Sequence, residues 1–200
     1  MRQSGHSTVP ECSGTVSLPG MKRGTVYLEA HQAAWAQIAR RTAADIQAAL
    51  QGLHPDVQHV GSTAIRTISA KPIIDLAVAV SDYGAVLARN AQLAAYGIMF
   101  RFDRRPSELL YVMGDFAADT RTHHIHVVMK DSPEWENYLN FRDYLNANAA
   151  AAAAYEAVKT EAAKQYPNDR QAYTEAKSRI ISGLLREAAI WRAQADSFTE

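Results

Sequence analysis

The segment from Lys71 to Val80 constrains the fold most, because it reads as a strand whose two faces differ in chemistry. Alternation along a strand gives one bulky aliphatic face and one face with a carboxylate among smaller residues: Ile74, Leu76, Val78 and Val80 against Ile73, Asp75, Ala77 and Ala79. A carboxylate in an apolar strand is costly unless cations or hydrogen-bond donors surround it. We therefore expect function at Asp75. The alternative is a structural acid that caps a turn or pairs with one arginine.

A Gly-Ser-Thr turn lies shortly before this strand, at Gly61, Ser62 and Thr63. Glycine permits a tight bend and a close backbone approach, and the two hydroxyl groups stand beside backbone N–H groups. Such a turn is able to hold a phosphate. An ordinary cap at a strand-to-helix junction is the competing interpretation.

Length and charge narrow the classes of function. A chain of 200 residues favours one domain with an appended helical part. The 21 basic residues balance the 21 acidic ones, so no overall field favours nucleic acid or an anionic membrane, although a local basic cluster is compatible with this balance. The single Cys12 excludes an internal disulfide and a cysteine metal site. With no apolar run near the roughly 20 residues of a membrane span and no secretion signal, the cytoplasm is the expected location.

The apolar patterns predict an α+β fold, with one mixed or antiparallel sheet flanked by helices and a C-terminal helical extension. Residues 1–24, rich in Ser, Gly, Thr and Pro, are expected to be a flexible leader. Residues 25–195 are expected to form a single domain, with its sheet core at about 25–130 and a helical tail at about 132–195. Helices are predicted at 28–50, 82–95, from 132 onward, through the alanine run to 166, and at 170–195; strands are predicted at 57–60, 71–80, 98–102, 109–113 and 121–129.

His124 and His126 share one face of the last predicted strand. The pair suits metal binding or proton transfer, and Asp75 would complete a set of two histidines and one carboxylate. The alternative is one packed and one exposed histidine. Lys71 and Arg121, each beside one of these strands, are candidates to neutralise phosphate, with surface or ion-pair roles as the alternative.

Two further groups carry charge near expected element ends. Arg101, Arg104 and Arg105 form a local basic run, which favours a solvated loop over an anion-binding site. Tyr173 and Lys177 lie four residues apart on one helix face, so both would look into one pocket or both would anchor the tail.

Taken together, these motifs resemble the GrpB family, which is placed with the nucleotidyltransferase-like folds related to DNA polymerase beta. The matching segments are 59–63, 71–76, 121–128, 141–145 and 169–177, in the family's order over roughly residues 25–190. The resemblance implies that fold. In the wider superfamily, a Gly-Ser turn precedes a strand with two acids one residue apart, and these acids hold divalent metal. Here Gly61 and Ser62 match the turn and Asp75 matches the first acid.

The chain departs from this pattern in two places. Ala77 stands at the second acid position and cannot bind metal, so a two-metal site is incomplete unless Asp103 or Asp115 reaches in. Family members commonly carry Val-Pro-Gly after the Gly-Ser-Thr, whereas this chain has Ala-Ile-Arg, which places the charge of Arg66 near any bound phosphate.

The first functional hypothesis is Mg²⁺-dependent transfer of a nucleotidyl or phosphoryl group from a nucleoside triphosphate to a small acceptor. The expected roles are catalysis by Asp75, His124 and His126, metal binding by Asp75, and phosphate or substrate binding by Gly61, Ser62, Thr63, Arg66, Lys71, Arg121 and Lys177. The second is a non-catalytic module that binds a nucleotide or supports a partner enzyme, as GrpB-like segments fused to dephospho-coenzyme A kinase imply. The third is a His/Asp metal site of small-molecule metabolism.

Overall fold

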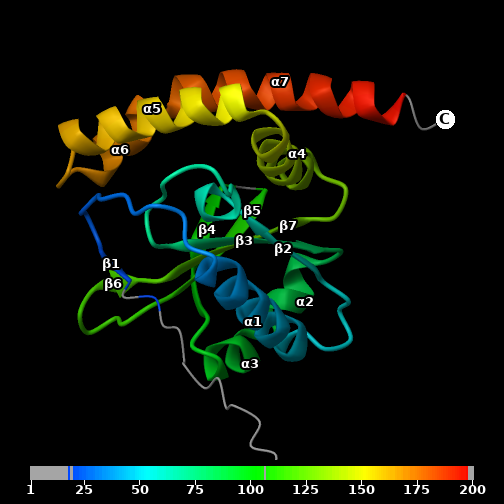
Figure 1. Ribbon diagram of the computed structural model, residues 1–200. Helices are drawn as coiled ribbons and strands as arrows, with labels where there is room; N and C mark the ends of the chain where they lie inside the picture. Colours follow the sequence, from blue (N-terminus) through cyan, green and yellow to red (C-terminus); the bar gives the residue numbers. More distant parts are fainter. Residues whose placement is uncertain (1–17, 19, 106, 198–200) are drawn as a thin grey trace, which may run out of the picture.

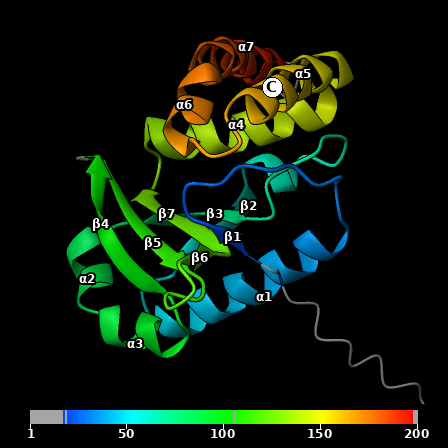
Figure 2. The same cartoon turned by 90° about the vertical axis from the view of Figure 1, so that its left-hand side faces the viewer.

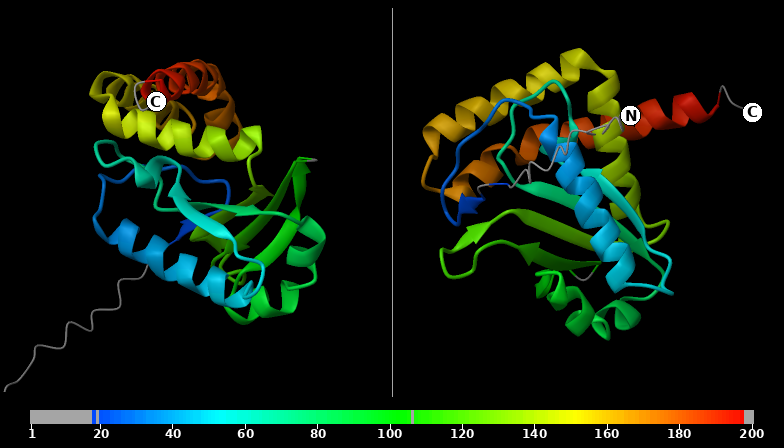
Figure 3. Two further views of the ribbon diagram at one scale, coloured as in Figure 1. Left: turned by 90° about the vertical axis from the view of Figure 1, so that its right-hand side faces the viewer. Right: turned by 60° about the horizontal axis from the view of Figure 1, so that its bottom comes forward.

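The computed structural model describes residues 18, 20–105 and 107–197, which are arranged in three layers. Figures 1 and 2 show a central sheet with α1, α2 and α3 on one face and α4 to α7 on the other. The left view of Figure 3 shows the same layers from the side opposite to that of Figure 2. Its right view shows the last helix extending past the edge of the sheet. The predicted α+β fold with a helical extension is therefore confirmed.

The sheet is mixed, as the sequence predicts. Its strands are β2 (Asp56–Val60), β3 (Ile74–Val80), β4 (Met99–Arg105), β5 (Glu108–Met113) and β7 (His123–Met129). In the described residues they lie in the order β2-β3-β7-β5-β4, and only the central β3–β7 pair is parallel. Two short strands, β1 (Met21–Lys22) and β6 (Thr120–Arg121), pair beside this sheet.

The helices follow the predicted order with different boundaries. They are α1 (Ala34–Ala49), α2 (Tyr83–Leu87), α3 (Asn90–Ala95), α4 (Pro133–Ala147), α5 (Ala149–Gln165), α6 (Arg170–Ala176) and α7 (Ser178–Asp196), with a 3-10 turn at Ser62–Ala64. The helix predicted at 82–95 is two short helices, and the last predicted helix is divided at Lys177. The expected cap of α4 is confirmed, because Ser132 accepts a hydrogen bond from the Trp135 N–H and Pro133 is the first helical residue.

Residues before α1 are more ordered than a flexible leader. Met21 pairs with Arg121 in the β1–β6 ladder and is 3% exposed. Glu29 and Ala70 form an antiparallel β-bridge, in which the backbone N–H of each donates to the carbonyl oxygen of the other at 2.8 Å. The predicted leader is therefore wrong for residues 20–24, and α1 begins later than residue 28 because the preceding chain is extended. Residues 1–17 of that prediction, and Cys12 with them, lie outside the described residues.

The two faces of β3 pack against different layers. Its aliphatic face joins the main core with α1, α2 and α3, as predicted: Ile74, Leu76, Val78 and Val80. On the other face, Ala77 and Ala79 contact Val128 and Trp135, so small residues let α4 lie against the sheet. Within the described residues, every helix is too short or too polar to traverse a lipid bilayer.

Candidate active site

The parallel pairing of β3 and β7 brings the lone strand acid to the paired histidines. Asp75 lies opposite His124 and Ala77 opposite His126 in the register. The His124 Nδ1 atom is 3.2 Å from Asp75 Oδ1, and the His126 Nε2 atom is 3.7 Å from the same oxygen. The carboxylate is therefore surrounded by hydrogen-bond donors, which is the condition that made an acid in this strand tolerable.

The glycine turn lies directly against this carboxylate. β2 pairs with β3 so that Val60 faces Asp75, and Gly61 follows with φ of 68°. A Cβ atom on Gly61 would lie 2.5 Å from Asp75 Oδ2 and 2.9 Å from Asp75 Cβ. Only glycine combines this backbone angle with this close approach.

Replacing Gly61 by alanine is expected to lower the free energy of unfolding by about 2–4 kcal/mol, from the left-handed backbone and the clash with Asp75 together. Gly52→Ala is the matched control, because Gly52 has φ of 88° and a methyl group added there would meet no neighbouring atom within 4 Å. It should cost only about 1–2 kcal/mol. Equal losses in urea unfolding of the two variants would show that the contact with Asp75 adds nothing.

His126 lies between two carboxylates, and one of them was not foreseen. Its Nδ1 atom is 2.7 Å from Glu108 Oε1, and the Tyr138 hydroxyl donates to Glu108 Oε2 at 3.0 Å. Burial lowers the pKa of His126, but the contacts with Asp75 and Glu108 outweigh this and raise it to about 9. His126 is therefore a cation at neutral pH. Glu108 stands at a strand end with no pattern around it that marks it as functional.

The other two groups of the centre, Asp75 and His124, differ in charge. Burial opposes ionisation of Asp75, yet the hydrogen bonds from His124 and His126 hold the pKa of its carboxyl far below its usual range. Burial lowers the pKa of His124 and exceeds the opposing effect of Asp75. The centre thus holds an ionised carboxylate, a neutral imidazole at His124 and an imidazolium at His126.

A pocket of about 170 Å³ opens beside Asp75, between the sheet and the helical extension. It contains six of the residues predicted for the site: Gly61, Ser62, Lys71, Asp75, His124 and Lys177. Ile73, Tyr155, Arg170 and Tyr173 complete its wall. Tyr173 and Lys177 line the same pocket, which is one of the two alternatives that their spacing allowed. Tyr155 and Arg170 come from helices whose position relative to the sheet the sequence does not reveal. We call this the Asp75 pocket.

Two lysines of the Asp75 pocket share one aromatic ring. The Nζ atoms of Lys177 and Lys71 lie 4.0 Å and 5.1 Å from the centre of the Tyr173 ring. Burial and the nearby ammonium groups of Lys71 and Lys159 lower the pKa of Lys177 to about 7. Burial and the Arg170 guanidinium lower the pKa of Lys71 to about 8. An anion placed between these ammonium groups would favour their charged forms.

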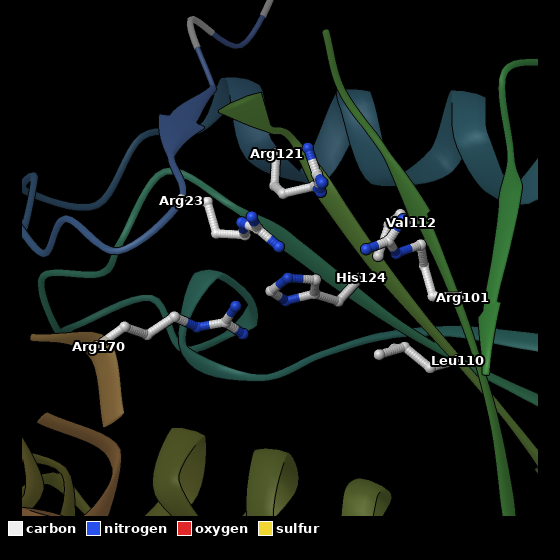
Figure 4. Close-up of a pocket in the computed structure, with 7 residues that line it drawn as sticks. All are labelled: Arg23, Arg101, Leu110, Val112, Arg121, His124 and Arg170. Carbon is white, nitrogen blue, oxygen red and sulfur yellow. The ribbon is translucent and has the colours of Figure 1, made fainter. Parts of the chain in front are cut away.

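A second pocket, of about 180 Å³, meets the first at His124 and Arg170 (Figure 4). Its lining is Arg23, Arg101, Leu110, Val112, Arg121, His124 and Arg170. We call it the arginine pocket. It includes the predicted Arg121 and one member of the basic run, Arg101, whereas Arg23 was not foreseen because it lies in the supposed leader.

Several predicted residues do not line the Asp75 pocket. Thr63 is buried, with its hydroxyl 2.9 Å from His59 Nε2. Arg66 is exposed, and its backbone N–H donates to Asn146. Asp115 accepts from the N–H groups of the turn that follows it, so it does not supply the missing acid. The side chains of Asp103, Arg104 and Arg105 lie outside the described residues.

The donor set determines which metal site these residues can form. Ala77 is fully buried and its side chain offers no oxygen, so β3 alone does not supply the paired acids of the superfamily. In the part of the chain that the structure describes, no three His, Cys, Asp or Glu side chains are placed to hold a metal, which goes against the two-histidine, one-carboxylate site. One ion held by Asp75 and by phosphate oxygens of a ligand does fit, because Mg²⁺ commonly uses one or two carboxylates plus substrate phosphates.

Comparison with known proteins agrees with this architecture. The family model described as "GrpB protein" matches residues 25–187. The glutamate-rich protein GrpB of Alkalihalophilus pseudofirmus is 33% identical over 171 residues, covering 84% of this chain and 98% of the relative. A UPF0157 protein of Streptomyces coelicolor is 32% identical over 183 residues, covering 92% and 95%. The crystal structure of the conserved protein GrpB from Enterococcus faecalis superposes with a TM-score of 0.75 at 27% identity, covering 81% of this chain and 96% of that one. The chain belongs to the GrpB family.

Proposed function

We propose that the Asp75 pocket binds a nucleoside triphosphate and that the protein transfers a nucleotidyl or phosphoryl group from it to a small acceptor. One observation carries the proposal: the Gly61-Ser62 turn, the Asp75 carboxylate and the ammonium groups of Lys71 and Lys177 line a single pocket. The placement of the GrpB family among nucleotidyltransferase-like folds supports the same reaction class.

The charges of the Asp75 pocket suit a polyphosphate. Lys71, Lys177 and Arg170 face one ionised carboxylate, so the pocket carries an excess of positive charge. Tyr173 is almost fully buried in the pocket wall, and its ring lies against the Nζ atoms of Lys71 and Lys177. Because the pocket is buried between two layers, each charge pair in it is screened less than a pair at the surface.

In the proposed transfer step, His124 accepts a proton and Asp75 orients His124. The acceptor hydroxyl oxygen forms a bond to phosphorus while the bond from that phosphorus to its bridging oxygen breaks, and pyrophosphate or a nucleoside diphosphate leaves. The hydroxyl proton passes to Nε2 of His124, whose Nδ1 is oriented by Asp75 at 3.2 Å. A magnesium ion bound to Asp75 and the triphosphate would neutralise charge on the phosphate oxygens.

A thermal-shift panel of nucleoside triphosphates, with and without magnesium, tests binding. A nucleotide present at about 100 times its Kd should raise the free energy of unfolding by about 2.7 kcal/mol and the Tm by about 5–10 °C. Lys177→Gln should raise the Kd of the nucleotide at least about tenfold, since it removes a charge-assisted contact to phosphate, and the stabilisation at the same concentration should fall to about 1.4 kcal/mol. Lys164→Gln, an exposed lysine of α5, is the control and should leave it unchanged. No shift with any nucleotide would refute the proposal.

The substitution at Ala77 favours a second candidate, a non-catalytic nucleotide-binding or accessory module. Ala77 is packed under α4, so the position on β3 that carries the second acid in the superfamily offers no carboxylate. This candidate predicts calorimetric binding of a nucleotide that is independent of magnesium, with no product formed. Magnesium-dependent binding accompanied by release of pyrophosphate or nucleoside diphosphate would decide against it.

A further inference from the structure

Four guanidinium groups from four separate segments converge on the arginine pocket. Arg23 follows β1, Arg101 lies on β4, Arg121 ends β6 and Arg170 begins α6. Figure 4 shows Arg23 and Arg170 directed toward the His124 ring, with Arg121 and Arg101 on other sides of the same space. Like charges held this close repel one another unless an anion lies between them.

Two of these arginines, Arg23 and Arg121, contact the carboxylate of Asp119. It is 3.2 Å from Arg23 Nε and 3.5 Å from Arg121 Nη2. The Arg121 side chain is only 8% exposed, and its other contacts are the Thr120 carbonyl and the face of the Phe116 ring. A buried guanidinium with one long ion pair retains donor capacity for a further anion.

The floor of the pocket is aliphatic and adjoins the proposed proton acceptor. Leu110 and Val112 of β5 lie opposite His126 and His124 in the antiparallel register. A ligand seated here would place its charge among the arginines and its body on this floor. Because the two pockets meet at His124 and Arg170, such a ligand would lie beside a triphosphate bound in the Asp75 pocket.

We infer that the arginine pocket receives the anionic group, a phosphate or a carboxylate, of the small acceptor that is modified. This rests on the proposed function, because it assigns the acceptor side of the same reaction. The arginine pocket, of about 180 Å³ and lined by four guanidinium groups, has room for one such anionic group of the acceptor.

The test measures two probes, inorganic phosphate and malonate, by calorimetry on the full chain saturated with magnesium and a non-hydrolysable ATP analogue. At least one probe should bind in the presence of the analogue. Arg121→Gln should raise the Kd of that probe about 10- to 100-fold, and Arg101→Gln should raise it at least about 5-fold. Arg186→Gln, which removes an exposed arginine of α7, should have no effect. If Arg121→Gln does not fold because Arg121 is buried, the affinity of the probe for Arg101→Gln, a change at a partly exposed residue, is the deciding measurement.

Three outcomes would overturn the inference. The first is probe binding that survives both arginine substitutions. The second is displacement of the probe by the ATP analogue, which would make the arginine pocket part of the triphosphate site. The third is arginine-dependent binding of a short single-stranded RNA that is tighter than that of either probe, which would indicate a polymer.

Failure of the proposed function is recognised separately. If no nucleotide analogue binds, phosphate is titrated into two variants. The first is Lys177→Gln, in which anion binding to the Asp75 pocket is weakened. The second is the double variant Lys177→Gln/Arg101→Gln. Binding that is retained in the first and lost in the second supports an anion site at the arginines without the nucleotide. Equal binding in both overturns it.

Discussion

Asp75→Asn is expected to reduce turnover about 100- to 1,000-fold, because the carboxylate that orients His124 and fits a single magnesium ion is lost. Turnover is measured as release of pyrophosphate or nucleoside diphosphate over a set of small phosphorylated and carboxylated alcohols. Affinity for the nucleotide without magnesium should be unchanged or higher, since a negative charge is removed from a pocket that also holds Lys71 and Lys177.

A loss of turnover without a loss of nucleotide affinity separates an effect on chemistry from a loss of folding. Asp45→Asn on α1 is the matched control and should leave both quantities unchanged, because α1 covers the other face of the sheet. Thermal unfolding of Asp75→Asn shows whether it is folded at the assay temperature, since His124 and His126 each lose a partner. Full turnover in a folded Asp75→Asn protein would refute the proposed mechanism.

Glu108→Ala is expected to lower the free energy of unfolding by about 3–5 kcal/mol, which corresponds to a Tm loss of roughly 10 °C or more. The carboxylate of Glu108 is 6% exposed and lies 2.7 Å from His126, so its removal leaves an imidazolium short of a partner inside the protein. The Tyr138 hydroxyl also loses its acceptor. Chemical denaturation with urea measures the loss, and Glu161→Ala, an exposed residue of α5, should stay within about 0.5 kcal/mol of the parent.

The same ion pair predicts how stability depends on pH. The pKa of His126 is raised from 6.5 to about 9 in the folded protein, so its contribution is fully present below about pH 6.5 and is lost as the pH rises through about 9. In Glu108→Gln the single amide oxygen still accepts from His126 Nδ1 but carries no charge, so the pKa of His126, followed by NMR titration, should fall. An unchanged pKa would show that Glu108 does not hold the proton on His126.

Local sequence patterns determined much of the fold and the centre of the site. Strand alternation placed Asp75 opposite the aliphatic face of β3 and put His124 and His126 on one face of β7, because a period of two is a property of each strand alone. Caps and breaks located α4. The same patterns misplaced the start of α1 and the supposed leader, because β1 and the Glu29 bridge depend on pairing with distant residues.

Only the tertiary structure decided which charged residues share a cavity. The parallel pairing of β3 with β7 joined Asp75 to His124, 49 positions away, and packing of α5 and α6 added Tyr155 and Arg170 to the same wall. Glu108 and Arg23 belong to the site because they lie beside residues that are distant in the sequence, and no local sequence pattern predicts those neighbours. The contacts with Asp75 and Glu108, which form when the strands pair, then set the charge of His126, and burial between the layers lowers the pKa of Lys177. Residue types and periods were therefore readable from the chain, while proximity and protonation required the fold.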